Sequence, residues 1–464
     1  MRRLLLITAA LVTTQGTWAQ ESADYRTTLE GYIAEGLRSN LALRSEALEV
    51  ERATQALAEA RARFLPQLSL EARYTRAQGG REISIPLGTT LNPVYSTLNE
   101  LLIAQGQPAR FGQIADATVP FLRETEQDTR VVVRQPLYAP AIPAAVRAQR
   151  ALLGAANFNR MAIARALRRD ITLAYLEWLK ARNSVEIVAA SESLLRENLR
   201  VNQSLFDNGK ITEDQVLRAR AELLAVEQQK RETENLVAQA RSYFNFLLNR
   251  HLETPIVPTT APTEPTAREA ALEHLWAMAL QRRPEIAQID ELRRAAEEQV
   301  DIARTERWPT LSLALDAGIQ GEDYGFGEGY NFGLASLVFT WRFDAGDNAR
   351  VRQARAAERK LVLRQEEVAQ QIRLEVQQAF DRLLTSRDSL ATAQARVEAA
   401  RAAFRIASRK RDEGVINQVE FIDARSALTS AELNLNLTRF DVLARRAELE
   451  YATSAGELPL DPGV

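Results

Sequence analysis

Four long stretches of this chain contain no residue that would break a helix. Residues 347–413 lack both glycine and proline, and the same holds for residues 155–208, 210–254 and 415–455. Glycine and proline disfavour a helix interior by roughly 1 and 3 kcal/mol relative to alanine. A single helix over residues 347–413 would be about 100 Å long. The chain therefore predicts helices far longer than those of ordinary globular domains.

An apolar stripe runs along each half of the chain, in steps of four and three residues. This is the spacing of a coiled-coil seam. The stripe comprises Leu167, Ile171, Ala174, Trp178, Ala181, Val185, Val188, Leu195, Leu199 and Phe206 in the first half, and Ile372, Val376, Ala379, Leu383, Leu390, Ala393, Val397 and Phe404 in the second. We expect both stripes to be packed cores of helical hairpins whose turns lie near Gly209 and Gly414.

The chain also repeats itself. Val146-Arg147 recurs as Val351-Arg352, and Asp207-Asn208-Gly209 recurs as Asp412-Glu413-Gly414 at the same spacing. The stretch around Pro66 recurs around Pro309 at a longer spacing, which indicates an insertion in the first half, near residues 78–127. The predicted organisation has a first structural repeat at 20–253, a proline-rich linker at 254–266 and a second repeat at 267–464.

The N-terminus has the pattern of a secretory signal. Arg2 and Arg3 precede a short apolar run, and small residues flank a cleavage position near Ala19. Residues 1–19 are therefore predicted to be a signal peptide. No later stretch has the roughly 18 apolar residues that a transmembrane helix needs.

Strand-like alternation begins where the helical pattern stops. Residues 67–75 and 310–320 alternate apolar and polar side chains, and returning strands are predicted at 129–138 and 331–343, with a phase slip near Ala335 interpreted as a bulge. About 10 alternating residues suffice for a bilayer-facing strand. A small barrel needs about 8 strands, so protomers would have to pool their four. Two chains would supply eight strands and three would supply twelve.

The order of these features resembles the TolC-like outer-membrane efflux protein family across essentially the whole mature chain. The resemblance rests on the duplicated element order, on Phe206-x-x-Gly209 and its echo at Gly414, and on Phe64-Leu65-Pro66 and Trp308-Pro309 before the strands. Residues 92–99 also look like a loop found in parts of the family. The resemblance implies a mainly α fold with a small β part. Three protomers would form an α-barrel of long hairpins across the periplasm and a 12-stranded β-barrel in outer-membrane lipid.

The same resemblance implies partners and site residues. A periplasmic adaptor would bind the hairpin tips, and an inner-membrane transporter would drive export. The tip residues are Gly209, Lys210, Ile211, Thr212, Gly414, Val415, Ile416 and Asn417. Glu420 and Asp423 match the family's acidic periplasmic gate, and their spacing puts both on one helical face. The plain alternative is a pair of solvated acids at a helix start.

The sequence departs from the family near this gate. The matching positions of the first half hold Gln215 and Arg218, so an acidic ring would come from second-half helices alone. Where family members hold the closed tip with aromatic and basic partners, this chain has Arg411 and Ile416. The details of that closed state are therefore not expected to carry over.

Composition excludes several other functions. The chain has 464 residues, no cysteine, two histidines and a formal charge of −2, and it lacks the phosphate-loop, hydrolase and metalloprotease motifs. We therefore expect no enzyme, no cofactor, no metal site and no nucleic-acid partner. The predicted function is an outer-membrane channel for small molecules or drugs. The alternatives are type I polypeptide secretion and, in a different class, a periplasmic coiled-coil adaptor or structural rod. The four strands with aromatic ends disfavour the rod.

Overall fold

A computed structural model describes residues 24–260, 270–456 and 458. The predicted signal peptide and residues 261–266 of the predicted linker lie outside this set. The chain divides into two compact units. The sheet unit comprises residues 55–150 and 294–358, and the helical unit comprises the rest.

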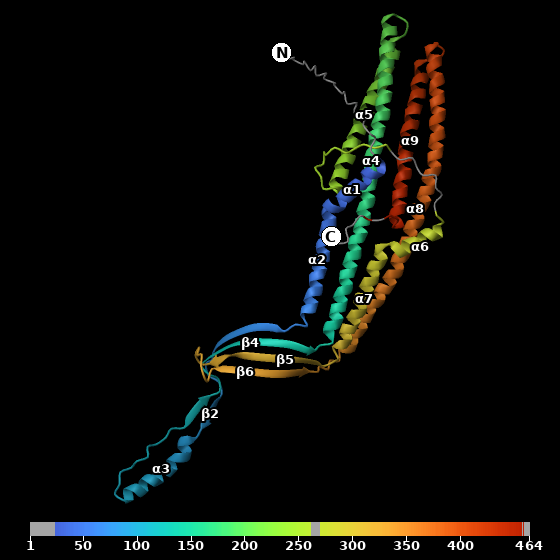
Figure 1. Ribbon diagram of the computed structural model, residues 1–464. Coiled ribbons are helices and arrows are strands. Elements are labelled where there is room, and N and C mark those ends of the chain that lie inside the picture. The colour runs from blue at the N-terminus through green and yellow to red at the C-terminus, as the bar shows by residue number, and fades with distance from the viewer. Residues whose placement is uncertain (1–23, 261–269, 457, 459–464) are drawn as a thin grey trace, which may run out of the picture. The chain divides into compact units, whose positions relative to one another are not determined.

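The same six elements occur twice along the chain: two short helices, two strands of one sheet and two long helices (Figure 1). The first set is α1 Tyr25–Ser39, α2 Leu41–Ala62, β1 Gln67–Arg76, β4 Thr125–Tyr138, α4 Ala141–Asp207 and α5 Glu213–Leu247. The second set is α6 Leu272–Arg282, α7 Pro284–Thr305, β5 Thr310–Gly321, β6 Asn331–Thr340, α8 Asp347–Asp412 and α9 Gln418–Ala452. The predicted long helices are confirmed, since α4 has 67 residues and α8 has 66.

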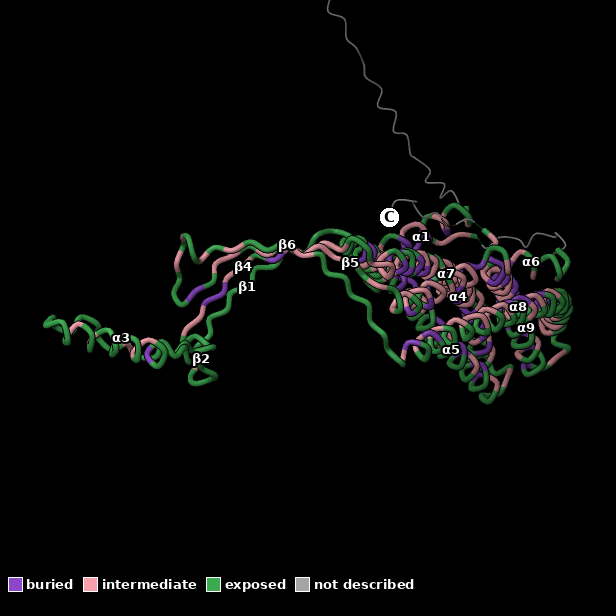
Figure 2. Tube along the Cα trace, turned by 90° about the horizontal axis from the view of Figure 1, so that it is seen from below, coloured by how far each residue is buried: buried purple, intermediate pink, exposed green. Residues whose placement is uncertain are grey.

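The core of the helical unit follows the predicted stripes. Most stripe members are buried, including Ile171 and Val188 on α4 and Val376 and Leu383 on α8, each fully inaccessible. Figure 2 shows buried residues gathered inside the helical unit. Phe206, at the end of the first stripe, is instead 37% exposed, because α4 ends one residue later.

An aromatic cluster anchors α1 to the long helices. The Tyr32 ring lies 5.6 Å from Tyr175 on α4 and 5.0 Å from Phe244 on α5, measured between centroids. The Tyr175 hydroxyl donates to the carbonyl of Val257 and the Val257 N–H donates to the Tyr32 hydroxyl, both at 2.9 Å. The beginning of the predicted linker is therefore held against this core.

Four strands of the sheet unit form one antiparallel sheet in the order β1-β4-β5-β6. β4 of the first repeat pairs with β5 of the second, so the two predicted hairpins join into one sheet. β1 and β6 are its edges, and each has an unpaired side within the described chain.

The predicted bulge near Ala335 is wrong. β5 and β6 pair without interruption from Thr310–Thr340 to Ile319–Asn331, and the register shift lies between β4 and β5 at Pro136 and Tyr138. The apolar side chains of β6 change faces while the backbone stays paired. Pro136 lacks the N–H that a regular ladder requires, which explains a break there.

The insertion folds into a small module of its own. β2 Glu82–Ile85 pairs with β3 Ala117–Pro120, and between them lies the helix α3 Leu87–Ala104. Two helix asparagines hold the returning chain: Asn92 exchanges hydrogen bonds of 2.8 and 2.9 Å with the backbone of Ile114. Asn99 does the same with Phe111, at 2.7 and 3.1 Å.

Candidate functional site

Both long hairpins turn through the same backbone geometry. Gly209 has φ of 70° and Gly414 has φ of 74°, a region that residues with a side chain rarely adopt. The N–H of Gly209 donates to Phe206 at 2.7 Å and that of Gly414 donates to Arg411 at 2.9 Å. The following residues, Lys210 and Val415, close the wider turn with bonds of 2.9 and 2.8 Å. Each is a Schellman-type helix end built on its glycine.

The two turns lie at the same end of the helical unit, at the top of Figure 1. Six of the eight predicted tip residues are exposed: Gly209, Lys210, Thr212, Gly414, Val415 and Asn417. Ile211 and Ile416 are half-buried. Val415 is the most exposed apolar side chain of the two turns, at 67%. The structure thus presents both turns outward.

Glu420 and Asp423 lie in the first two turns of α9. Asn417 caps this helix, its side chain accepting a hydrogen bond from the Glu420 N–H at 2.9 Å. Both acidic side chains are exposed and point from one helical face. Within the described residues neither carboxylate has an ion pair or hydrogen bond. The structure therefore places both predicted gate acids exposed at the start of α9, where among the described residues neither has an ion pair.

A stack of aromatic and cationic side chains lies directly beside these acids. The Arg411 guanidinium is 4.1 Å from the centroid of Phe421, and Phe421 lies 5.6 Å from Phe404. Arg425 covers the other ring, 5.5 Å from Phe404, and its Nε donates to Ser191 Oγ at 3.4 Å. This stack joins α8 to α9, and Arg425 extends it to α4.

Phe404 belongs to the predicted stripe of the second half, but no sequence pattern assigned a role to Arg425. Only 8% of Arg425 is exposed, and this burial lowers its pKa, while the charge of Glu432 acts in the opposite direction. The available signal was an arginine one helical turn from the apolar positions Phe421 and Leu428. Arg411, which departs from the family pattern, still provides a basic partner for an aromatic ring.

The sheet has one apolar face that lies open. Leu68 and Leu70 of β1 are 73% and 71% exposed, and Leu337 and Phe339 of β6 are 68% and 62% exposed. Their register partners on β4 and β5, such as Val133 and Leu315, share this face. A contiguous exposed apolar surface of this kind marks contact with protein or lipid.

The opposite face of the sheet is polar and carries ion pairs between neighbouring strands. Arg130 lies 3.1 Å from Glu71, directly across the β1–β4 ladder. Arg73 lies 3.3 Å from Asp128, the next pair on the same face. The alternation predicted from sequence therefore separates an apolar side from a charged side.

The described residues contain no cluster of three or more His, Cys, Asp or Glu side chains placed to hold a metal ion. Among the helices that the structure describes, none is both long and apolar enough to cross a membrane.

Comparison with known proteins gives one family and several related folds. Residues 275–455 match the family of outer membrane efflux proteins. The outer-membrane channel OprN superposes with a TM-score of 0.73 at 19% identity, over 93% of this chain and 91% of that chain. The CmeC outer membrane channel of Campylobacter jejuni gives 0.74 at 17% identity, over 99% and 96%. VceC of Vibrio cholerae gives 0.71 at 17% identity, over 93% and 97%. No curated protein sequence matches the chain.

The family match covers most of the second repeat, including Gly414, Glu420 and Asp423. The shared fold extends over nearly the whole chain and therefore includes the first repeat and the sheet. Proteins of this family are channels of the outer membrane with a helical tunnel in the periplasm, and they are not enzymes. Residues 275–455 therefore belong to the outer membrane efflux protein family, and nearly the whole chain shares the fold of the outer-membrane channel OprN.

Proposed function

We propose that three copies of this chain form a channel-tunnel that exports small molecules from the periplasm across the outer membrane. The observation that carries the proposal is the four-stranded sheet, with an open apolar face and two unpaired edges. Unpaired backbone groups in hydrocarbon cost several kcal/mol each, so such edges require partners.

The strand directions allow copies to close into a ring. Neighbouring strands alternate in direction from β1 to β6, so the two edge strands run in opposite directions. β6 of one copy can therefore pair antiparallel with β1 of the next, and this head-to-tail contact closes by rotation. The family resemblance supports three copies, which supply twelve strands with the apolar face toward lipid.

In the same assembly the long hairpins would form the α-barrel. The exposed turns at Gly209 and Gly414 would bind a periplasmic adaptor, and an inner-membrane transporter would supply the energy. Glu420 and Asp423 of three copies would place six carboxylates around one axis. Their exposure and the lack of a neutralising partner within the described chain support this gate.

The trimer is tested by introduced cysteines, since the chain has none of its own. Ser69→Cys on β1 is combined in turn with a cysteine at Phe332, Leu334 or Ser336 on β6. All three positions lie on the same face of the sheet as Ser69. At least one pair should give a cross-linked trimer on a denaturing gel. Ser69→Cys with Val132→Cys is the control, because these register partners should cross-link within one chain. A monomeric or dimeric mass in detergent would contradict the proposal.

Export of small molecules is tested by deleting the gene and measuring retention of fluorescent drugs. Retention should rise and should return to normal when the gene is restored. If drug retention is unchanged while a polypeptide disappears from the medium, type I secretion is the function instead. If deletion changes neither drug retention nor polypeptide secretion and the outer membrane stays normal, the structural rod is favoured instead.

The division of the chain into a signal peptide and two repeats belongs to the same proposal. N-terminal sequencing of the mature protein should find it beginning near Gln20. Retention of residues 1–19 in the exported protein would contradict it.

A further inference from the structure

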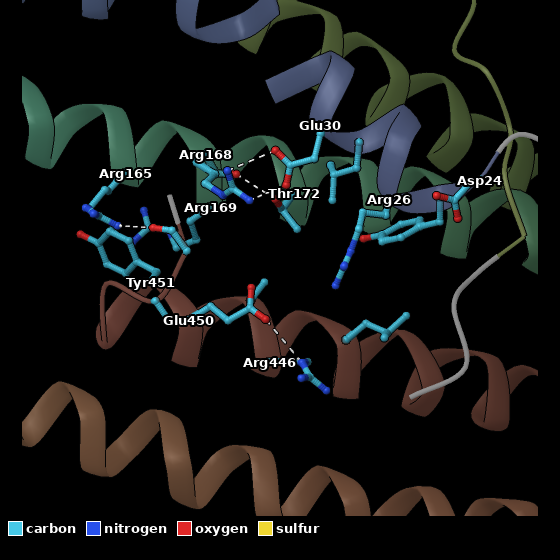
Figure 3. Close-up of a pocket in the computed structure, with 16 residues that line it drawn as sticks. Asp24, Arg26, Glu30, Arg165, Arg168, Arg169, Thr172, Arg446, Glu450 and Tyr451 are labelled. Carbon is cyan, nitrogen blue, oxygen red and sulfur yellow. Dashed lines mark hydrogen bonds and ion pairs between the residues drawn. The ribbon is translucent and has the colours of Figure 1, made fainter. Parts of the chain in front are cut away.

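A cavity of about 830 Å³ lies within the helical unit, away from the turns and the gate acids. It is formed by α1, α4, α9 and the residues that follow α9 (Figure 3). Five arginines line it: Arg26, Arg165, Arg168, Arg169 and Arg446. Only three acids do so: Asp24, Glu30 and Glu450. The cavity wall therefore has an excess of positive charge.

Two of the arginines are neutralised at close range. Arg168 lies 2.5 Å from Glu30. Arg169 lies 2.7 Å from Asp170 and stacks 4.3 Å from the ring centroid of Tyr451. Of the other three arginines, Arg446 also has a carboxylate nearby, Glu450 at 3.4 Å, whereas Arg26 and Arg165 have no ion pair within the described residues.

Arg165 has no carboxylate partner within the described residues. It donates only to the backbone carbonyls of Ser454 and Gly456, at 3.3 and 3.2 Å, and its Nε is buried without a hydrogen bond. Burial lowers its pKa, and neighbouring arginines such as Arg168 and Arg283 lower it further, against the opposing effect of Glu285. Arg165 therefore adds a positive charge to the cavity wall that no described carboxylate pairs with.

Arg446 and Arg26 face the same space from opposite sides. Arg446 Nε lies 3.4 Å from Glu450, but its Nη1 is buried and unpaired. Arg26 projects from the start of α1 into the gap between α1 and α9 (Figure 3). Buried guanidinium N–H groups without acceptors cost free energy, and a bound anion would supply those acceptors.

The remaining wall is apolar and aromatic. Leu29 and Leu443 are buried there, and Tyr25 and Tyr451 contribute rings. Burial raises the pKa of both tyrosines, so neither adds negative charge at neutral pH. A volume of this size suits an organic ligand, since small-molecule pockets are about 300–1,000 Å³.

We infer that this cavity binds an organic anion whose phosphate or carboxylate group contacts Arg26 and Arg446 while its apolar or aromatic body lies against Tyr25, Leu29 and Leu443. The site lies in a single copy of the chain. It does not depend on the trimer or on the export function proposed above.

The test is titration calorimetry on the full-length protein in dodecyl maltoside, with phenyl phosphate as the probe. Saturable binding of one phenyl phosphate per chain is expected, weakening as salt is added. Inorganic phosphate should bind about tenfold more weakly, because it lacks the apolar body. Benzyl alcohol, which has the ring without the charge, should not bind measurably.

Variants locate the site. Arg446→Gln should weaken binding of phenyl phosphate by about tenfold or more, the usual value of a charge-assisted hydrogen bond, whereas Arg165→Gln, farther along the cavity, should weaken it less. Arg26→Gln is exposed and cannot disturb packing, so it should fold normally and still weaken binding severalfold. Arg231→Gln, an exposed arginine of α5 outside the cavity, is the matched control.

Three results would overturn the inference. The first is no saturable binding of phenyl phosphate by folded protein. The second is undiminished binding by Arg26→Gln together with Arg446→Gln. The third is equal affinity for inorganic phosphate, which would show that the apolar wall contributes nothing.

Discussion

The α4–α5 and α8–α9 hairpins have the same turn but different surroundings. Their glycines have φ values within a few degrees of each other, and the bonds that close the turns match. Beyond the turn the repeats diverge. Arg425 on α9 is buried, whereas Arg220, at the equivalent position on α5, is exposed.

The shafts of the hairpins differ in a similar way. Arg196 lies 3.3 Å from Glu227 in the first hairpin, and the equivalent Arg401 lies 3.1 Å from Glu432 in the second. Next to this retained pair, the first hairpin has Glu192 held by Lys230 at 2.8 Å. The second has Val397 and Leu435 at the same positions.

This comparison shows which properties belong to a local sequence and which to a place in the fold. The turn is local, because glycine alone permits its positive φ. The burial of Arg425 or Arg220 is not a local property, because it depends on which other helix packs against the helix that carries the arginine. Ser191 on α4 and Thr429 on α9 surround Arg425, with their hydroxyl oxygens 3.2 Å apart.

The largest effect is expected from breaking the second turn. Gly414→Val should abolish efflux and adaptor cross-linking while leaving the trimer in the membrane. A β-branched residue at this φ is strained by roughly 1–2 kcal/mol, although a Cβ there would meet no atom within 4 Å. Gly414→Asn is the control, since asparagine tolerates this conformation. Normal drug resistance in Gly414→Val would count against the tip assignment, and Gly209→Val tests whether the first turn matters equally.

The next largest effect concerns the acids that only the second hairpin has. Glu420→Ala with Asp423→Ala should remove block by multivalent cations added from the periplasmic side and weaken cation selectivity, by on the order of tenfold. Single-channel conductance in planar bilayers measures both. Gln215→Ala with Arg218→Ala, at the equivalent positions of α5, is the matched control. Identical block in wild type and the acid double variant would reduce Glu420 and Asp423 to solvated helix-start acids.

A smaller effect should separate the two equivalent arginines. Arg425→Ala is expected to lower the free energy of unfolding by about 2 kcal/mol, because it empties a packed position between α4, α8 and α9. Arg220→Ala should change it by no more than about 0.5 kcal/mol. Thermal unfolding of the detergent-solubilised proteins compares them. Arg425→Met, which keeps the volume, should recover most of the loss, and equal midpoints for both alanine variants would show that the burial is irrelevant.

The smallest effect is a difference in acid sensitivity between the hairpins. The hydrogen bond from Lys230, together with Arg196, holds the pKa of Glu192 below its usual value. The resulting stability is fully present above the ordinary glutamate pKa and is lost as pH falls through the lowered value. Hydrogen exchange, corrected for its intrinsic pH dependence, should show α5 near Lys230 losing about threefold more protection than α9 between pH 7 and pH 4. Glu192→Gln should erase this difference, and its persistence would assign it to other groups.

Much of the fold was predictable because its signals are local. The absence of glycine and proline predicts the long helices, Gly209 and Gly414 predict the turns, and alternation after Pro66 and Pro309 predicts strands. Glu420 and Asp423 share a helical face by spacing alone. Each inference uses residues within a few positions of one another, where backbone geometry leaves few alternatives.

Other features could not be inferred because they depend on distant neighbours. Asn92 and Asn99 lie on one helix of the insertion. Their side-chain amides hydrogen-bond to the backbone of Ile114 and Phe111, which follow the helix, much as a neighbouring strand would. The sequence predicts a break in strand pairing near Ala335, whereas the structure has it at Pro136. Strand pairing depends on which strand lies alongside, and that is not readable from one strand's own residues.

The sequence by itself therefore determined the helices, their turns, the alternating strands and the exposed acids of α9. Only the tertiary structure decided that β4 pairs with β5, that Arg425 is buried while Arg220 is not, and that five arginines meet at one cavity. The physical reason is one of range. Backbone propensity and periodicity act over a few residues, whereas burial and the pairing of charges depend on segments that only folding brings together.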